Sequence, residues 1–175
     1  MQIIKSHDIV VLLKLLCKGK GGWKYESLEQ ELTLSKSAIF RSLNRCANAK
    51  FISSSPFQQF YIKNLSEFLI HGIQYVFVTE PGKTTRGIAT AHSASPLNNV
   101  IISEKDVYIW SYAKGNLRGQ AIEPLIKHAA EIVKSDNDLY ELLTLIDAIR
   151  VGKTREKQIA ATMLTEKLDN YAANY

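Results

Sequence analysis

The sequence predicts an α+β protein that is mainly helical. Three observations lead to this class. Apolar residues recur at spacings of three and four along most of the chain, which is typical of amphipathic helices. A few short apolar segments flanked by turn residues have the pattern of strands. The 175 residues are 46% hydrophobic and 22% charged, a composition that supports a folded core and excludes a disordered chain.

The N-terminal third is expected to hold three helices and two short strands. The helices are predicted at residues 6–16, 26–32 and 35–48, and the strands at 51–54 and 59–62. Ser6 and Ser35 are the expected N-caps of the first and third helices. The glycine-rich segment 18–22 ends the first helix, and the turn-rich segment 55–58 separates the strands.

The remainder of the chain is expected to be helical at both of its ends. Helices are predicted at residues 65–77, 124–134, 138–151 and from Thr154 onward, with strands at 107–112 and 117–122. The two strands are expected to pair as a hairpin. The segment 79–105 shows no sustained period and is expected to be a long loop. Ser135–Asp138 has the spacing of a capping box, and Gly152 is a natural helix stop.

The order of helix, short helix, three-residue turn, helix and two strands is that of a winged helix-turn-helix. The second helix of the pair has to present an apolar face to the core and a polar face to a major groove about 12 Å wide. Leu34, Ile39 and Leu43 are expected to pack inward. The residues expected to face outward and bind DNA are Lys36, Ser37, Phe40, Arg41, Asn44, Arg45 and Lys50.

These outward residues suggest different roles. Arg41 and Asn44 carry donors that fit guanine and adenine edges, respectively. Arg45 and Lys50 are expected to contact phosphates. Phe40 could touch a thymine methyl, although an aromatic at helical spacing is more often packed.

At Ser27–Leu43 and at Ala49-Lys50-Phe51-Ile52 the chain resembles the MarR-like and ArsR-like winged helix-turn-helix transcriptional regulators. The resemblance covers about residues 6–63. It implies DNA binding, usually as a dimer, with the second helix in the groove and the wing on the backbone. The sequence departs from the family pattern in two ways, because Lys50 replaces the usual turn glycine and the short wing carries no basic residue.

Charge is distributed unevenly along the chain. Residues 1–63 hold ten basic and four acidic residues, a net charge of +6, whereas residues 121–175 have a net charge of −2. A basic excess that coincides with a helix-turn-helix favours nucleic acid as the partner. The sequence therefore predicts two parts, a DNA-binding domain at 1–63 and a helical part at 64–175 for dimerisation or partner binding.

The sequence predicts no catalytic, cofactor or metal site, so an enzyme is the least favoured class. The histidines lack partners at metal-ligand spacing, and Cys17 and Cys46 lie on apolar helix faces as expected core thiols. Two cysteines make no disulfide framework, and no apolar run is long enough to span a membrane, so the cytoplasm is the expected location. The basic residues at 150–157 either complement a helix C-terminus, which is the favoured interpretation, or contact an acidic partner or a phosphate backbone.

The most favoured function is sequence-specific binding of double-stranded DNA by a transcriptional regulator. A homodimer is expected, because such domains read two half-sites, and its interface should include last-helix residues such as Leu164 or Leu168. The alternative is an antitoxin-like or other regulatory protein that uses the winged helix and the C-terminal helices to bind a protein partner.

Overall fold

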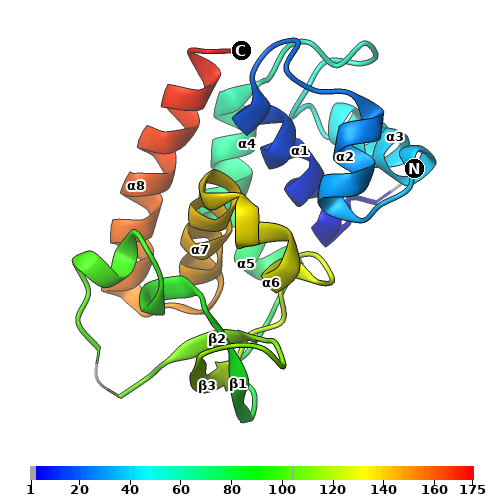
Figure 1. The fold of residues 1–175 in the computed structure, drawn as a ribbon. Coiled ribbons are helices and arrows are strands. Elements are labelled where there is room, and N and C mark those ends of the chain that lie inside the picture. Colours follow the sequence, from blue (N-terminus) through cyan, green and yellow to red (C-terminus); the bar gives the residue numbers. More distant parts are fainter. Residues whose placement is uncertain (1–2, 104) are drawn as a thin grey trace.

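The computed structural model describes residues 3–103 and 105–175. The predicted class is confirmed, because the chain is α+β and mainly helical, with one small three-stranded sheet. Figure 1 shows the sheet at one end of the molecule, α7 in the middle, α8 along one side and the first three helices on the opposite side. No helix among the described residues combines the length and the apolar character needed to cross a bilayer.

The N-terminal helices lie close to their predicted positions. They are α1 (Ser6–Lys18), α2 (Tyr25–Leu32) and α3 (Lys36–Asn48). Ser35 caps α3 as predicted, since its Oγ accepts a hydrogen bond from the Ala38 amide at 3.2 Å. The expected cap Ser6 is instead the first residue of α1, and the N-cap is Lys5, whose amide donates to Asp8 Oδ2 at 2.7 Å.

Helix α1 is buried on every side. Every residue from Asp8 to Leu16 is buried, because α3 covers one flank while α7 and α8 cover another. The only lysine in this stretch, Lys14, bonds to Glu31 on α2 at 2.6 Å and to Asp136, the N-cap of α7. Burial alone would lower the pKa of Lys14, but its hydrogen bonds to Asp136 and Glu31 raise it. Residues from both predicted parts of the chain thus share one core around α1.

The helix predicted at 65–77 is interrupted by a π-helical turn. Its three pieces are α4 (Ile62–Glu67), the π turn (Phe68–Gly72) and α5 (Ile73–Val76). Leu65, Leu69 and Ile73 are fully buried as the periodicity predicted. The glycine within the turn is needed for packing, because a Cβ on Gly72 would lie 3.0 Å from the Phe68 ring.

Two expectations for the middle of the chain are wrong. The predicted loop 79–105 contains a strand, β1 (Thr84–Ala89), and two 3₁₀ turns (Ala91–Ser93 and Leu97–Asn99). The predicted hairpin does not form, since β2 (Tyr108–Ser111) and β3 (Leu117–Ala121) pair in parallel.

The three strands form a closed barrel, because β1 pairs antiparallel with both β2 and β3, and β2 and β3 also pair with each other. So tight a closure requires backbone without side chains at the crossing points. A Cβ on Gly87 of β1 would lie only 2.0 Å from the carbonyl oxygen of Trp110 on β2.

The C-terminal helices keep the predicted order, but the helix predicted at 124–134 is reduced to residues 129–132 followed by a 3₁₀ turn, and the cap of the next helix also differs. They are α6 (Ala129–Ile132), a 3₁₀ turn (Val133–Ser135), α7 (Asn137–Val151) and α8 (Thr154–Ala172). Asp136 rather than Ser135 caps α7, because its Oδ1 accepts from the Leu139 amide at 3.1 Å. Gly152 ends α7 and Thr154 begins α8 as predicted.

The predicted dimer contacts in the last helix are wrong. Leu164 and Leu168 are both 0% exposed, because α8 packs its apolar face against α7, α4 and α1 of the same chain. These side chains stabilise the single chain and are not available to a second one.

Candidate nucleic-acid interface

The interface candidate is the exposed face of α3 together with the segment that follows it. Ile39, Leu43 and Cys46 are fully buried and hold the inner face of α3 against α1 and α2. This orientation fixes which residues remain outside. Lys36, Ser37, Phe40 and Arg41 are exposed on the first two turns of α3, where base edges are read in helix-turn-helix proteins.

Besides Arg45, three of the predicted DNA-binding residues have polar side-chain partners within the chain. Lys36 Nζ donates to Glu26 Oε1 at 2.7 Å, and this hydrogen bond raises the pKa of Lys36. Both side chains are well exposed, so the pair contributes little stability and can exchange for a phosphate. Asn44 is half-buried, and its Nδ2 donates to the carbonyl oxygen of Phe40 at 2.9 Å. Ser37 Oγ lies 3.2 Å from Ser35 Oγ.

Arg41 differs from these residues. It is exposed, and the described part of the chain gives its guanidinium no hydrogen-bonding partner. Its donors are free to meet a base edge or a phosphate.

Arg45 is the one predicted interface residue that the structure contradicts. It is 6% exposed, and its Nε and Nη2 donate to Asp8 on α1 at 2.7 and 2.6 Å. Ser42 Oγ also accepts from Arg45 Nη2, at 3.3 Å. Because the guanidinium is enclosed between α3 and α1, Arg45 cannot contact a phosphate and instead joins these two helices.

Phe40 is exposed at its edge but is also packed. Its ring meets the buried ring of Phe57 edge-on, with centroids 6.0 Å apart. Phe57 belongs to the segment predicted as the wing, so Phe40 connects α3 to that segment. The contact leaves Phe40 46% exposed.

The segment 52–60 folds back on itself as a minimal hairpin. Ile52 and Phe60 form an antiparallel bridge, and the Ser53 amide donates to the Gln59 carbonyl at 2.7 Å. The two predicted strands are thus reduced to a single bridge. The exposed residues of its tip are neutral, as the sequence indicated: Ser54, Ser55, Pro56 and Gln58.

Two aromatic residues, Trp23, expected from the sequence only as an apolar anchor, and Tyr175, support this hairpin. Tyr175 donates its hydroxyl to the Phe57 carbonyl at 3.2 Å, and Trp23 Nε1 donates to the same hydroxyl at 3.2 Å. The rings of Tyr175 and Phe60 lie 4.5 Å apart, edge to face. Residues from the start and the end of the chain therefore hold the hairpin in place. No local pattern could have predicted this, because the partners are far apart in sequence.

Lys50 is exposed directly after α3 and takes a left-handed backbone conformation, with a φ of 60°. This region favours glycine, which is the residue that the family pattern has at this turn. The Asn64 side chain donates to the Lys50 carbonyl at 2.8 Å and helps to hold the turn. The lysine therefore places a positive charge beside the hairpin at a cost in backbone energy.

Burial keeps the thiols of Cys17 and Cys46 protonated and therefore weakly nucleophilic. Cys46 is fully buried, as predicted, and its Sγ donates to the Asp8 carbonyl oxygen at 3.6 Å. Burial raises the pKa of Cys46, and it raises that of the half-buried Cys17 to about 12.

Comparisons with protein families, characterised proteins and solved structures found no match for this chain.

Proposed function

We propose that the protein binds double-stranded DNA through α3, as a transcriptional regulator. The observation that supports this best is the pairing of an apolar inner face on α3 with an exposed outer face that carries Lys36, Ser37 and Arg41. The three-residue turn between α2 and α3, and the single-bridge hairpin that follows α3, support a proposed winged helix-turn-helix. The basic excess of residues 1–63 lies in the same part of the chain.

The residues divide into base-reading and phosphate-contacting groups. Arg41 and Ser37 lie near the start of α3 and are proposed to read base edges. Lys36 and Lys50 are proposed to contact phosphates, and Lys36 would exchange Glu26 for the DNA backbone. Phe40 is proposed to hold the hairpin beside α3 with its ring and to offer only its exposed edge to DNA.

A homodimer on two half-sites remains part of the proposal. Its interface has to use residues other than Leu164 and Leu168, which are buried within one chain.

Selection of binding sequences from random duplexes, followed by anisotropy titrations at several salt concentrations, tests the proposal. Arg41→Ala should cost about 1–3 kcal/mol of specific binding and relax one position of the selected site. Arg155→Ala, an exposed substitution on α8, is the matched control. Selection that yields no enriched sequence, or equal affinity in folded Arg41→Ala, would contradict the proposal.

A further inference from the structure

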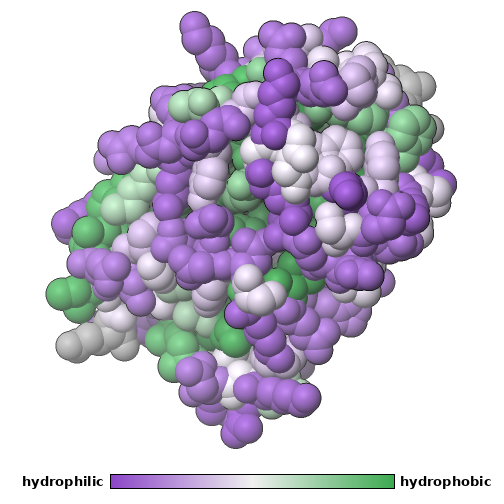
Figure 2. Space-filling view, turned by 45° about the horizontal axis from the view of Figure 1, so that its top comes forward, coloured by the Kyte–Doolittle hydropathy of each residue, from purple (hydrophilic) through white to green (hydrophobic). Residues whose placement is uncertain are grey.

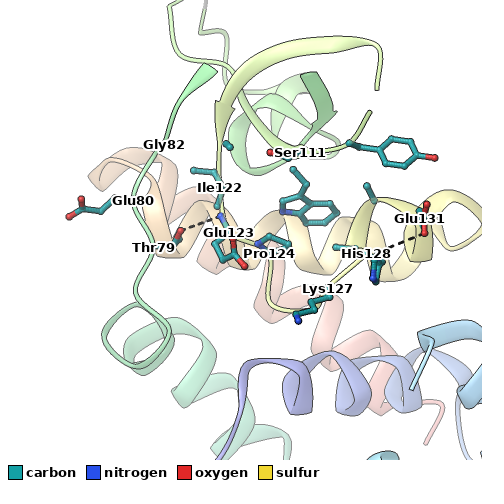
Figure 3. A pocket seen from close by; sticks show the side chains of 15 residues that line it. Thr79, Glu80, Gly82, Ser111, Ile122, Glu123, Pro124, Lys127, His128 and Glu131 are labelled. Carbon is teal, nitrogen blue, oxygen red and sulfur yellow. Dashed lines mark hydrogen bonds and ion pairs between the residues drawn. The ribbon is translucent and has the colours of Figure 1, made fainter. Parts of the chain in front are cut away.

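A second surface lies away from α3, where the chain forms a cavity of about 580 Å³ between the sheet and α6. Its volume falls within the range of about 300–1,000 Å³ that ligand-binding pockets have. Figure 3 labels lining residues from four segments: 79–82 after α5, Ser111 of β2, the turn that follows β3, and the start of α6. Trp110 and Ser111 at the end of β2, with Tyr112 directly after it, also line the cavity.

The cavity is held in shape by a buried ion pair on α7. Asp147 is 1% exposed and accepts hydrogen bonds from Trp110 Nε1 at 2.7 Å and Thr90 Oγ1 at 2.8 Å. Arg150, the first of the basic residues at 150–157, is 8% exposed and donates to Asp147 Oδ1 at 2.7 Å. The same guanidinium donates to the carbonyl oxygens of Phe77 and Glu123, each at 3.0 Å.

These hydrogen bonds connect the parts of the cavity to one another. Asp147 fixes the indole in the lining, and Arg150 fixes the two chain segments that form one side. The Glu123 amide also donates to Thr79 Oγ1 at 3.3 Å, joining those segments directly (Figure 3). The cavity is thus formed in advance of any ligand, which lowers the entropic cost of binding.

The lining combines apolar surface with an acidic rim. Trp110, Ile122 and Pro124 supply apolar surface. Figure 3 shows Glu80 and Glu131 at opposite ends, with Glu123 and Lys127 between them. These three carboxylates outnumber Lys127 and Lys134, which lies over the ring of the lining residue Tyr112, while His128 lies 4.0 Å from Glu131. The acidic excess favours a cation and disfavours DNA, RNA or an anionic membrane.

Three exposed apolar residues directly precede the first cavity segment in the sequence. Tyr75, Val76 and Val78 are 75%, 49% and 70% exposed, and Val78 directly precedes Thr79 in the cavity wall. The face drawn in Figure 2 is mostly hydrophilic, with apolar atoms in small groups. A small cation would fill the cavity without covering these three residues, whereas a protein segment can cover both.

We propose that the cavity and the patch formed by Tyr75, Val76 and Val78 are the docking surface for a protein partner whose segment carries apolar side chains beside a lysine or arginine. The basic side chain enters the cavity between Glu123 and Glu131, with its methylene groups against the apolar lining. The neighbouring apolar side chains cover the patch.

The test uses the full chain and a phage-displayed library of short random peptides. The expected result is enrichment of peptides that combine a basic residue with aromatic or aliphatic ones. Binding of the best synthetic peptide, measured by calorimetry, should weaken by about tenfold or more in Glu123→Gln/Glu131→Gln and in Tyr75→Ser/Val78→Ser.

Matched controls separate this surface from general charge and apolar effects. Glu166→Gln on α8 removes an exposed carboxylate elsewhere, and Ile102→Ser removes an apolar side chain that is 90% exposed in another loop. Both should bind the peptide as the unmodified protein does. Circular dichroism melting shows whether the docking variants remain folded, as expected for changes at exposed positions.

Four outcomes would overturn the proposal. They are no enrichment, enrichment of acidic peptides, peptide binding that the docking variants leave unchanged, and agmatine binding as tightly as the peptide, which would indicate a site for a small cation. A fifth comes from light scattering: a dimer that Tyr75→Ser/Val78→Ser converts to monomers would assign the patch to a second copy of this chain.

Discussion

Arg45 on α3 donates two hydrogen bonds to the carboxylate of Asp8 on α1, at 2.7 and 2.6 Å. Asp8 is fully buried and also accepts from the Lys5 amide at the start of α1. The Asp8 carboxylate therefore both accepts the hydrogen bond that caps α1 and holds α3, the helix proposed to read DNA, against α1.

Removing one member of this pair should destabilise the fold. Arg45→Ala leaves the Asp8 carboxylate buried without its cation, so the free energy of unfolding should fall by about 3–5 kcal/mol. Urea denaturation followed by circular dichroism measures the loss. The exposed Arg41→Ala on the same helix should stay within about 0.5 kcal/mol of the unmodified protein. If Arg45→Ala unfolded at the same urea concentration as Arg41→Ala, the buried pair would not hold these helices together.

A second stability prediction concerns the packing of Leu43. It is fully buried on the inner face of α3, so Leu43→Ala should cost about 2–5 kcal/mol of stability. The same urea titrations check this value. Ala38→Ser, at a half-buried position on the same helix, serves as a mild comparison. Native-like melting of Leu43→Ala would mean that α3 is rotated and that another face is exposed.

Lys50→Gly should change stability and DNA affinity in opposite directions. Glycine adopts the left-handed backbone of position 50 without strain, which stabilises the folded state, but it also gives the unfolded chain more conformational freedom. The net free energy of unfolding should rise by about 0.5–1 kcal/mol. Loss of the proposed phosphate contact should weaken DNA binding and reduce the salt slope by about one.

Lys50→Ala is the control for this pair of effects, because it removes the charge but keeps the strained backbone. It should weaken DNA binding to the same extent without the gain in stability. Weaker stability in Lys50→Gly than in Lys50→Ala would show that the turn does not favour glycine.

His7 should make stability fall as the solution becomes mildly acidic. Burial lowers the pKa of His7 below its ordinary 6.5, and nearby Arg45 and Lys5 lower it further against the opposing effect of Asp8. Near pH 6.5 the His7 imidazole therefore takes up a proton in the unfolded chain, whereas in the folded chain it remains neutral. The contribution of His7 is fully present above about pH 7 and is lost as the pH falls towards the lowered pKa.

Thermal melting at a series of pH values measures this effect as the difference between the unmodified protein and His7→Gln. The melting temperature of His7→Gln should fall less between about pH 7 and pH 5. His71→Gln, at an exposed histidine, should follow the unmodified protein. Parallel curves for all three proteins would exclude His7 as the titrating group.

Features encoded by neighbouring residues were predictable from the sequence. Ser35 caps α3, Gly152 ends α7, and Leu43 lies on the buried face, because caps, stops and helical periods depend on residues within a few positions. The exposure of Lys36, Ser37 and Arg41 follows from the same period.

Features that depend on distant residues were not predictable. Arg45 lies at the border of the apolar face, and only its partner 37 residues earlier decides that it is buried. The strand β1 has no alternating pattern, and its pairing with both β2 and β3 depends on closure of the whole sheet. Trp23 and Tyr175 support the hairpin from opposite ends of the chain.

The enclosure of α1 has a consequence for how the chain acquires its structure. Helix α1 is synthesised about 120 residues before α7, which with α8 covers one of its flanks. The apolar residues on that flank therefore remain uncovered, or held by other proteins, until α7 and α8 have been synthesised, whereas α3 can cover the other flank much earlier. Folding dominated by such distant contacts is slow for a helical protein, and a nascent chain that stalls before α7 should be prone to aggregation.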